Sequence, residues 1–71
     1  MSDEELAALL EGVAEDLGER ILHCLREAAS ATEGGGDPPP SLLAEEKRLS
    51  RARRSVVKAM LLLRPFEINE D

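Results

Sequence analysis

A break made of three glycines and three prolines divides this chain of 71 residues into two halves. The glycines are Gly34 to Gly36 and, after Asp37, the prolines are Pro38 to Pro40. Glycine leaves the backbone free and proline lacks the N–H donor of a helix interior, so no regular element continues through this stretch. Because a short linker usually joins neighbouring elements, the sequence predicts that the second half folds back on the first.

Both halves carry the apolar spacing of α-helices. In the first half apolar residues recur at steps of three and four, and Ser2 and Glu5 stand at the spacing of a capping box. In the second half Leu42, Leu49 and Val56 are spaced by seven, as in a coiled coil. Asp37 and Ser41 are the candidate caps of the second helix. The chain has one aromatic residue and its apolar residues are mainly the helix formers Ala and Leu, which disfavours a sheet.

The predicted fold class is therefore all-α, a two-helix antiparallel hairpin in a single domain over residues 1–71. We expect a helix over about residues 3–31, a linker over about 32–40, a second helix over about 41–64 and an acidic tail at 65–71. The helix stripes should face each other and form the hairpin core, since each is apolar at helical spacing. Its predicted members are Leu10, Val13, Leu17, Ile21 and Cys24 on the first helix, with Leu49, Ala52 and Val56 on the second.

Charge is segregated along the chain. Residues 1–37 carry ten acidic and two basic side chains, a net charge of −8, whereas residues 41–64 carry two acidic and seven basic ones, a net charge of +5. Like charges at helical spacing repel, so we predict that Arg51 and Arg54 face acidic groups on the first helix or on a partner chain. The basic residues lack interleaved aromatics and the chain as a whole has a net charge of −6, so nucleic acid is not the favoured partner.

Residue types for catalysis or metal binding are sparse. The chain has one histidine and one cysteine, the adjacent His23 and Cys24, which are too few for a four-ligand zinc site or a disulfide. Cys24 falls on the apolar stripe, where a thiol usually serves as a small hydrophobe. We therefore expect no catalytic residues, no metal, no cofactor and no enzymatic activity. The lone thiol, the acidic start of the chain and the lack of a long apolar run favour a cytoplasmic protein that does not span a membrane.

Apolar residues also lie off the predicted core. A helix that is apolar on every side is normally buried on every side, and two helices alone cannot achieve that. We therefore predict that another chain, a helical protein partner or a second copy, completes the hairpin, as small domains often require. The predicted partner-binding residues are Leu22, Leu25, Val57, Met60 and Leu61.

The layout resembles the small type III secretion co-chaperones of the YscE kind. The likeness is carried by Gly35-Gly36-Asp37 in the turn and by the segment from Leu42 to Met60, with its Leu-x-x-Ala rhythm at Leu49 and Ala52. The resemblance implies a protein that pairs with a helical-repeat chaperone in the bacterial cytoplasm and helps to keep a needle subunit from polymerising. Two other functions fit the residues: a self-assembling structural helical bundle subunit, and a nucleic-acid-associated regulator that uses the basic second helix.

Overall fold

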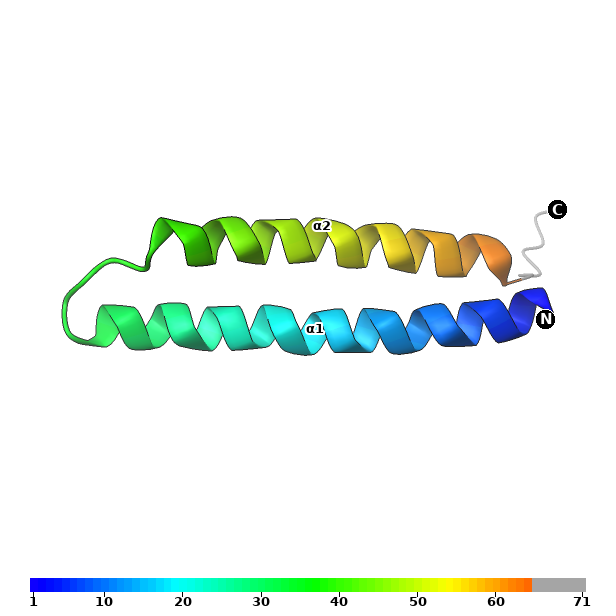
Figure 1. The fold of residues 1–71 in the computed structure, drawn as a ribbon, viewed down its shortest axis with the longest axis horizontal. Helices are drawn as coiled ribbons and strands as arrows, with labels where there is room; N and C mark the ends of the chain where they lie inside the picture. The colour runs from blue at the N-terminus through cyan, green and yellow to red at the C-terminus, as the bar shows by residue number, and fades with distance from the viewer. Residues whose placement is uncertain (65–71) are drawn as a thin grey trace, which may run out of the picture.

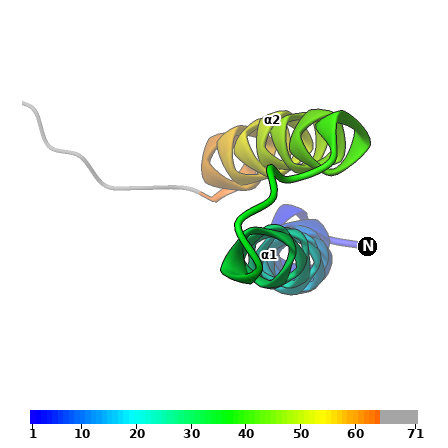
Figure 2. The same cartoon turned by 90° about the vertical axis from the view of Figure 1, so that its left-hand side faces the viewer.

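Two long helices lie side by side and run in opposite directions (Figure 1). The computed structural model describes residues 1–64, in which α1 spans Asp3–Glu33 and α2 spans Pro40–Leu63, with no strand in that range. The predicted all-α antiparallel hairpin is confirmed. Viewed from the loop, α1 and α2 lie beside each other, joined by the linker (Figure 2). The predicted acidic tail at 65–71 lies outside the described residues.

The start of α1 forms the expected capping box. The backbone N–H of Glu5 donates to Ser2 Oγ at 3.1 Å, and the backbone N–H of Ser2 donates to Glu5 Oε1 at 2.8 Å. These bonds satisfy two donors that the helix leaves unpaired. The helix ends two residues later than residue 31, at Glu33, with Gly34 as its C-cap. Gly35 then adopts a φ of +89°, a backbone conformation that favours glycine and turns the chain towards α2.

The start of α2 differs from the expectation that Asp37 or Ser41 caps it. Pro39 is the N-cap and Pro40 is the first helical residue, and no side chain accepts a cap hydrogen bond. Proline fits this position because its fixed φ is already helical and the N–H that it lacks would have no partner there. The three prolines therefore end the linker and also set the first turn of α2.

The seam between the helices is narrow. Along α1 the buried and half-buried positions recur mostly at steps of three and four. Along α2 the corresponding row includes two charged residues, the half-buried Glu46 and the exposed Arg53, whose Nε reaches the backbone oxygen of Ala14. Among residues 1–64 the buried residues are all small: Ala7, Ala14 and Cys24. The α1 seam is Ala7, Leu10, Ala14, Leu17, Ile21, Cys24 and Ala28, and the α2 seam is Leu42, Glu46, Leu49, Arg53, Val56, Met60 and Leu63.

Two predicted core residues, Val13 and Ala52, were placed wrongly, because both are exposed. Ala14 takes the place expected of Val13, since an alanine allows closer approach of the helices. Arg53 takes the place expected of Ala52. Its Nε donates to the backbone oxygen of Ala14 at 3.2 Å, and a Cβ at Gly18 would lie 3.5 Å from that nitrogen. Arg53 therefore lies beside Gly18 at the edge of the seam, and α2 is rotated by about one residue from the expected orientation. The other six predicted core residues are buried or half-buried.

Nothing in the described contacts requires a glycine at position 12. A Cβ at Gly12 would meet no atom within 4 Å, and the residue lies within α1 with a negative φ. We expect Gly12→Ala to raise the free energy of unfolding by about 1 kcal/mol, the usual helix-propensity difference. Thermal unfolding followed by circular dichroism measures this gain. The matched control is Gly35→Ala, which should destabilise the hairpin because of the positive φ. Equal effects of the two substitutions would contradict the prediction.

Candidate interaction surfaces

One face of the hairpin carries His23, and we call it the His23 face. On α1 it contains the row Leu9, Val13, Asp16, Arg20 and His23, whose steps of four and three keep them on one side of a helix. On α2 the corresponding row is Glu45, Arg48, Ala52, Ser55, Ala59 and Leu62. The two rows share a face because Glu45 lines the same surface hollow as Asp16, Arg20 and His23.

The opposite face is called the Arg54 face. Its α1 row is Glu11, Glu15, Gly18, Leu22 and Leu25, and its α2 row is Leu43, Lys47, Ser50, Arg54, Val57, Leu61 and Arg64. A salt bridge joins these rows, with Arg64 Nη2 and Glu11 Oε1 at 2.9 Å. Because both side chains are partly exposed, this pair contributes only about 0–1 kcal/mol.

The register of the helices follows from three contacts. Gly18 lies beside Arg53, Cys24 lies close to Glu45 and Glu46, and Ala31 shares a hollow with Pro39. The two antiparallel helices have the same rise per residue. The numbers of an α1 residue and of the α2 residue level with it therefore add up to about 70. Leu9 is therefore level with the region of Leu61 and Leu62 on α2.

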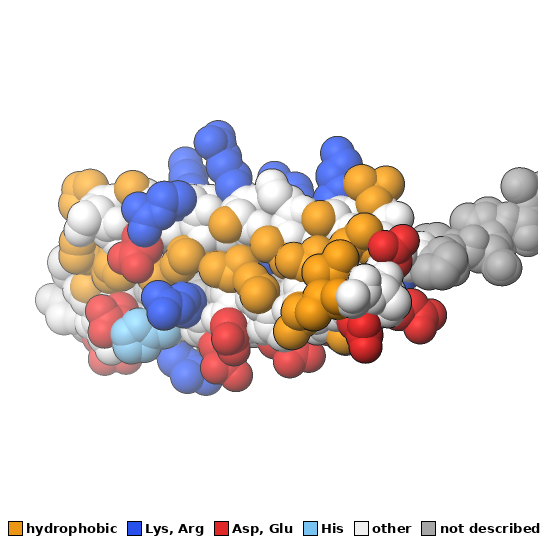
Figure 3. Space-filling view, turned by 45° about the vertical axis from the view of Figure 1, so that its right-hand side comes forward, with side chains coloured by type: hydrophobic (Ala, Val, Ile, Leu, Met, Phe, Trp, Pro, Cys, Tyr) orange, Lys and Arg blue, Asp and Glu red, His pale blue; other side chains and the backbone are white. Residues whose placement is uncertain are grey.

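An exposed apolar surface lies on the His23 face at the open end of the hairpin, where α1 begins and α2 ends. Leu62 is 80% exposed and Leu9 is 58% exposed, and Leu6 and Val13 beside Leu9 are also exposed. In the α2 row of the His23 face, the small residues Ala52 and Ala59 precede Leu62. Figure 3 shows hydrophobic side chains gathered at this end, on the face where the histidine is visible. We call Leu6, Leu9, Val13, Ala59 and Leu62 the open-end patch. Contiguous exposed apolar surface of this kind marks interaction sites.

The five predicted partner-binding residues do not form one patch. Leu22, Leu25 and Leu61 are exposed on the Arg54 face, Val57 is half-buried there, and Met60 is half-buried in the seam. Leu22 is level with about residue 48 of α2, so it lies roughly 13 Å along the helix axis from Val57. Leu22 and Leu25 instead share the Arg54 face with the exposed Leu43, on the side towards the loop. Sequence reasoning missed Leu43 and the open-end patch.

Arg51 and Arg54 are both exposed on the outer side of α2. Within the described 64 residues the salt bridges are His23–Glu27 and Arg64–Glu11, so neither arginine is paired with a carboxylate of α1. The acidic groups expected to face these arginines are therefore not supplied by α1. The prediction also allowed Arg51 and Arg54 to face acidic groups on a partner chain, and that part stays a prediction.

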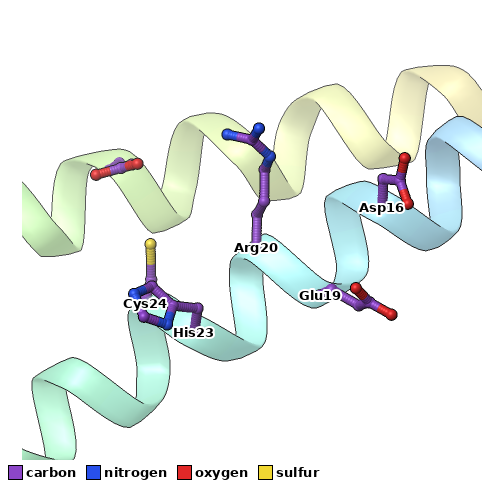
Figure 4. Close-up of a pocket in the computed structure, with 6 residues that line it drawn as sticks. Asp16, Glu19, Arg20, His23 and Cys24 are labelled. Atoms are coloured by element: carbon purple, nitrogen blue, oxygen red, sulfur yellow. The ribbon is translucent and has the colours of Figure 1, made fainter.

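A shallow hollow on the His23 face is lined by His23 and Cys24, the two residue types that catalysis would use (Figure 4). The sulfur of Cys24 is directed towards α2, and the side chain of Arg20 extends in the same direction. His23 is well exposed, and its Nε2 lies 3.1 Å from Glu27 Oε2, one turn along α1. Neighbouring residues of a helix do not face each other, so the imidazole is not positioned as a base for the thiol. Glu46, level with Cys24, accepts a hydrogen bond from Ser50 Oγ at 2.8 Å.

The Cys24 thiol is expected to be unreactive at neutral pH. Burial first, and then the carboxylates of Glu45, Glu46 and Glu27, raise its pKa above the ordinary value, so the protonated thiol is favoured. A thiol reagent at pH 7.5 should therefore react many times more slowly with the folded chain than with the chain in denaturant, as a stopped-flow or spectrophotometric assay measures. A raised pKa stabilises the fold fully below the pKa of the unfolded thiol, and this contribution is lost as the pH rises through the folded pKa. Equal rates in the folded and unfolded chains would contradict the assigned burial.

Two further observations concern the described residues alone. No group of three or more His, Cys, Asp or Glu side chains among residues 1–64 is arranged to hold a metal ion. Neither α1 nor α2 combines the length and the apolar character that crossing a membrane requires.

No protein-family model, curated protein or solved structure matches this chain. The surfaces of the hairpin itself are therefore the basis on which a function can be proposed.

Proposed function

We propose that this chain is a protein–protein interaction module, a small co-chaperone or adaptor subunit, whose hairpin is completed by helices of another chain. One observation carries the proposal: no large side chain among residues 1–64 is fully buried, and the buried positions are two alanines and a cysteine. Burying a leucine stabilises a protein by about 1.5–3 kcal/mol, so a seam whose large residues are only half-buried contributes less to folding than a fully buried core does.

Exposed leucines support the same proposal. They lie at both ends of the hairpin, as the open-end patch on the His23 face and as Leu22, Leu25 and Leu43 on the Arg54 face. Single exposed apolar residues are ordinary, whereas clusters that span both helices suit a third helix that lies along them. A partner helix would cover these leucines and supply the burial that the isolated hairpin lacks.

The specific form of the proposal is a cytoplasmic co-chaperone of type III secretion. It rests on the resemblance of the turn and of the segment from Leu42 to Met60 to such co-chaperones. In that role the hairpin and a helical-repeat chaperone would jointly cover a needle subunit. A gene for this chain beside genes for a secretion needle and its chaperone would support the specific form, and co-expression with those proteins should yield a complex. Failure to form that complex would remove the specific form and leave the general one.

The general proposal is tested on the full chain alone. At low micromolar concentration we expect a shallow thermal transition in circular dichroism and binding of a hydrophobic dye, because the apolar surface is uncovered. Stability should rise with the concentration of whatever chain covers that surface. A cooperative, concentration-independent transition of a monomer that binds no dye would refute the proposal, since such a hairpin would be complete by itself.

A further inference from the structure

We propose that the His23 face docks a second copy of this chain, so that α1 of each copy lies over α2 of the other in a four-helix bundle. The inference rests on the proposed function and names its partner. Two properties of the face, its charge distribution and its pattern of large and small residues, point to this occupant.

The charge distribution is the first property. The open-end patch is bordered along α1 by acidic side chains, Asp16 and Glu19, and along α2 by basic ones, Arg51 and Lys58. A covering helix pair therefore needs a basic edge over α1 and an acidic edge over α2. The hairpin itself has these two edges at the same spacing, so a second copy supplies both of them, whereas towards the loop Arg20 of one copy lies near the level of Arg48 of the other.

The symmetry follows from the same charges. A two-fold axis parallel to the helices puts α1 over the partner's α2, with the acidic edge against the basic edge and each helix antiparallel to its new neighbour. A two-fold axis perpendicular to the helices would put α1 over α1 and the acidic edge against itself. The parallel axis is thus the arrangement that the charges favour, and it keeps both open ends at the same end of the bundle.

The register places specific residues opposite each other in this arrangement. Glu19 is level with Arg51 of the second copy, and Asp16 falls between the levels of Arg51 and Lys58, because level residues sum to about 70. Within one chain no ion pair joins Glu19 to Arg51. The predicted counter-charge of Arg51 is then the second copy's Glu19, whereas Arg54, on the opposite face, remains uninvolved.

Side-chain size is the second property. On α1 the patch presents large residues, Leu6, Leu9 and Val13, whereas the facing row on α2 presents Ala52, Ser55 and Ala59 before Leu62. At the register above, Val13 of one copy would lie over Ser55 and Ala59 of the other, and Leu9 would lie against Leu62, because level residues sum to about 70. The loop-end half of the face carries charges of both signs, including Arg20, Glu45 and Arg48, so the apolar contact is confined to the open end.

The experiment measures the mass of the full chain in solution by sedimentation equilibrium over a range of concentrations. A contact over half of one face is smaller than a standard stable interface, so we expect a monomer–dimer equilibrium in the micromolar range. Leu9→Glu and Leu62→Glu should each weaken dimerisation at least ten-fold. The matched control is Ala29→Glu, which places the same charge at an exposed position of α1 that belongs to neither leucine cluster and should leave the dimer unchanged.

A charge swap supplies a readout that loss of folding cannot mimic. Glu19→Arg and Arg51→Glu should each weaken the dimer about two- to five-fold for each of the two equivalent contacts, the usual range for exposed pairs. The double variant carries both reversals in every copy and should regain most of the affinity, because each arginine again meets a glutamate. Arg54→Glu is the control and should have no effect. High salt should weaken the wild-type dimer.

The outcomes separate this inference from the proposed function. A wild-type chain that stays monomeric at high concentration, while its thermal transition remains shallow, overturns the second copy and leaves the need for another partner. A dimer that tolerates Leu9→Glu and Leu62→Glu but is broken by Leu25→Glu places the contact on the Arg54 face and also overturns the inference. A complete, stable monomer overturns both.

Discussion

Val56→Asp is expected to remove most of the helical signal of the isolated hairpin at neutral pH. Val56 is half-buried at the centre of the seam, at the level of Ala14, and the substitution replaces apolar contact with a desolvated carboxylate. The expected cost is about 3 kcal/mol, a large share of the total stability of a small domain. Leu17→Asp acts in the same way but less strongly, because Leu17 is level with Arg53, whose guanidinium offers a counter-charge.

The pH dependence of this variant distinguishes an unpaired charge from a simple packing defect. Burial raises the pKa of the introduced carboxyl, so the charge penalty is absent below the pKa of an unfolded aspartate, near 3.9, and develops as the pH rises through the folded pKa. Helicity measured by circular dichroism should therefore recover, relative to the wild type, at about pH 3. The control Ser55→Asp places the same side chain at the adjacent exposed position and should retain the helices at neutral pH. Equal loss in both variants would mean that the seam has been assigned wrongly.

Ala14→Leu is expected to force the helices apart and to cost about 1–3 kcal/mol, the usual range for overpacking. Ala14 is 4% exposed, and its backbone oxygen accepts the hydrogen bond from Arg53 Nε, so a larger side chain displaces both α2 and the arginine. Denaturant unfolding measures the change. Ala8→Leu is the matched control, since Ala8 is exposed on the same helix and leucine is nearly as good a helix former as alanine. A gain of stability from Ala14→Leu would show that the helices do not meet closely at this position.

The sequence predicted the outline of the fold for local reasons. The glycines and prolines between residues 34 and 40 allow no helix to pass, and the Ser2–Glu5 pair caps α1 by a bond that spans three residues. Apolar spacing of three, four and seven then required two helices with facing stripes. These features depend only on near neighbours along the chain, which is why the hairpin followed from the sequence.

The candidate surface followed from the sequence only in part. That exposed leucines would remain was predictable, because two helices cannot cover an apolar excess spread around both. Which leucines remain exposed depends on the rotation of each helix about its own axis, and a rotation of one residue exchanges Val13 for Ala14. For that reason Leu22, Leu25 and Leu61 were identified as exposed, whereas Leu6, Leu9 and Leu43 were not.

By itself the sequence determined that this chain forms two antiparallel helices with opposite net charges, because glycine, proline, caps and apolar period act locally. Only the tertiary structure decided the rotation of the helices. Ala7 and Ala14 lie buried in the seam because close approach of the helices needs small residues. Arg53 lies beside Gly18 and donates to the backbone oxygen of Ala14. Contacts between residues 39 positions apart decide between stripes of similar hydrophobicity, and no local pattern contains that information.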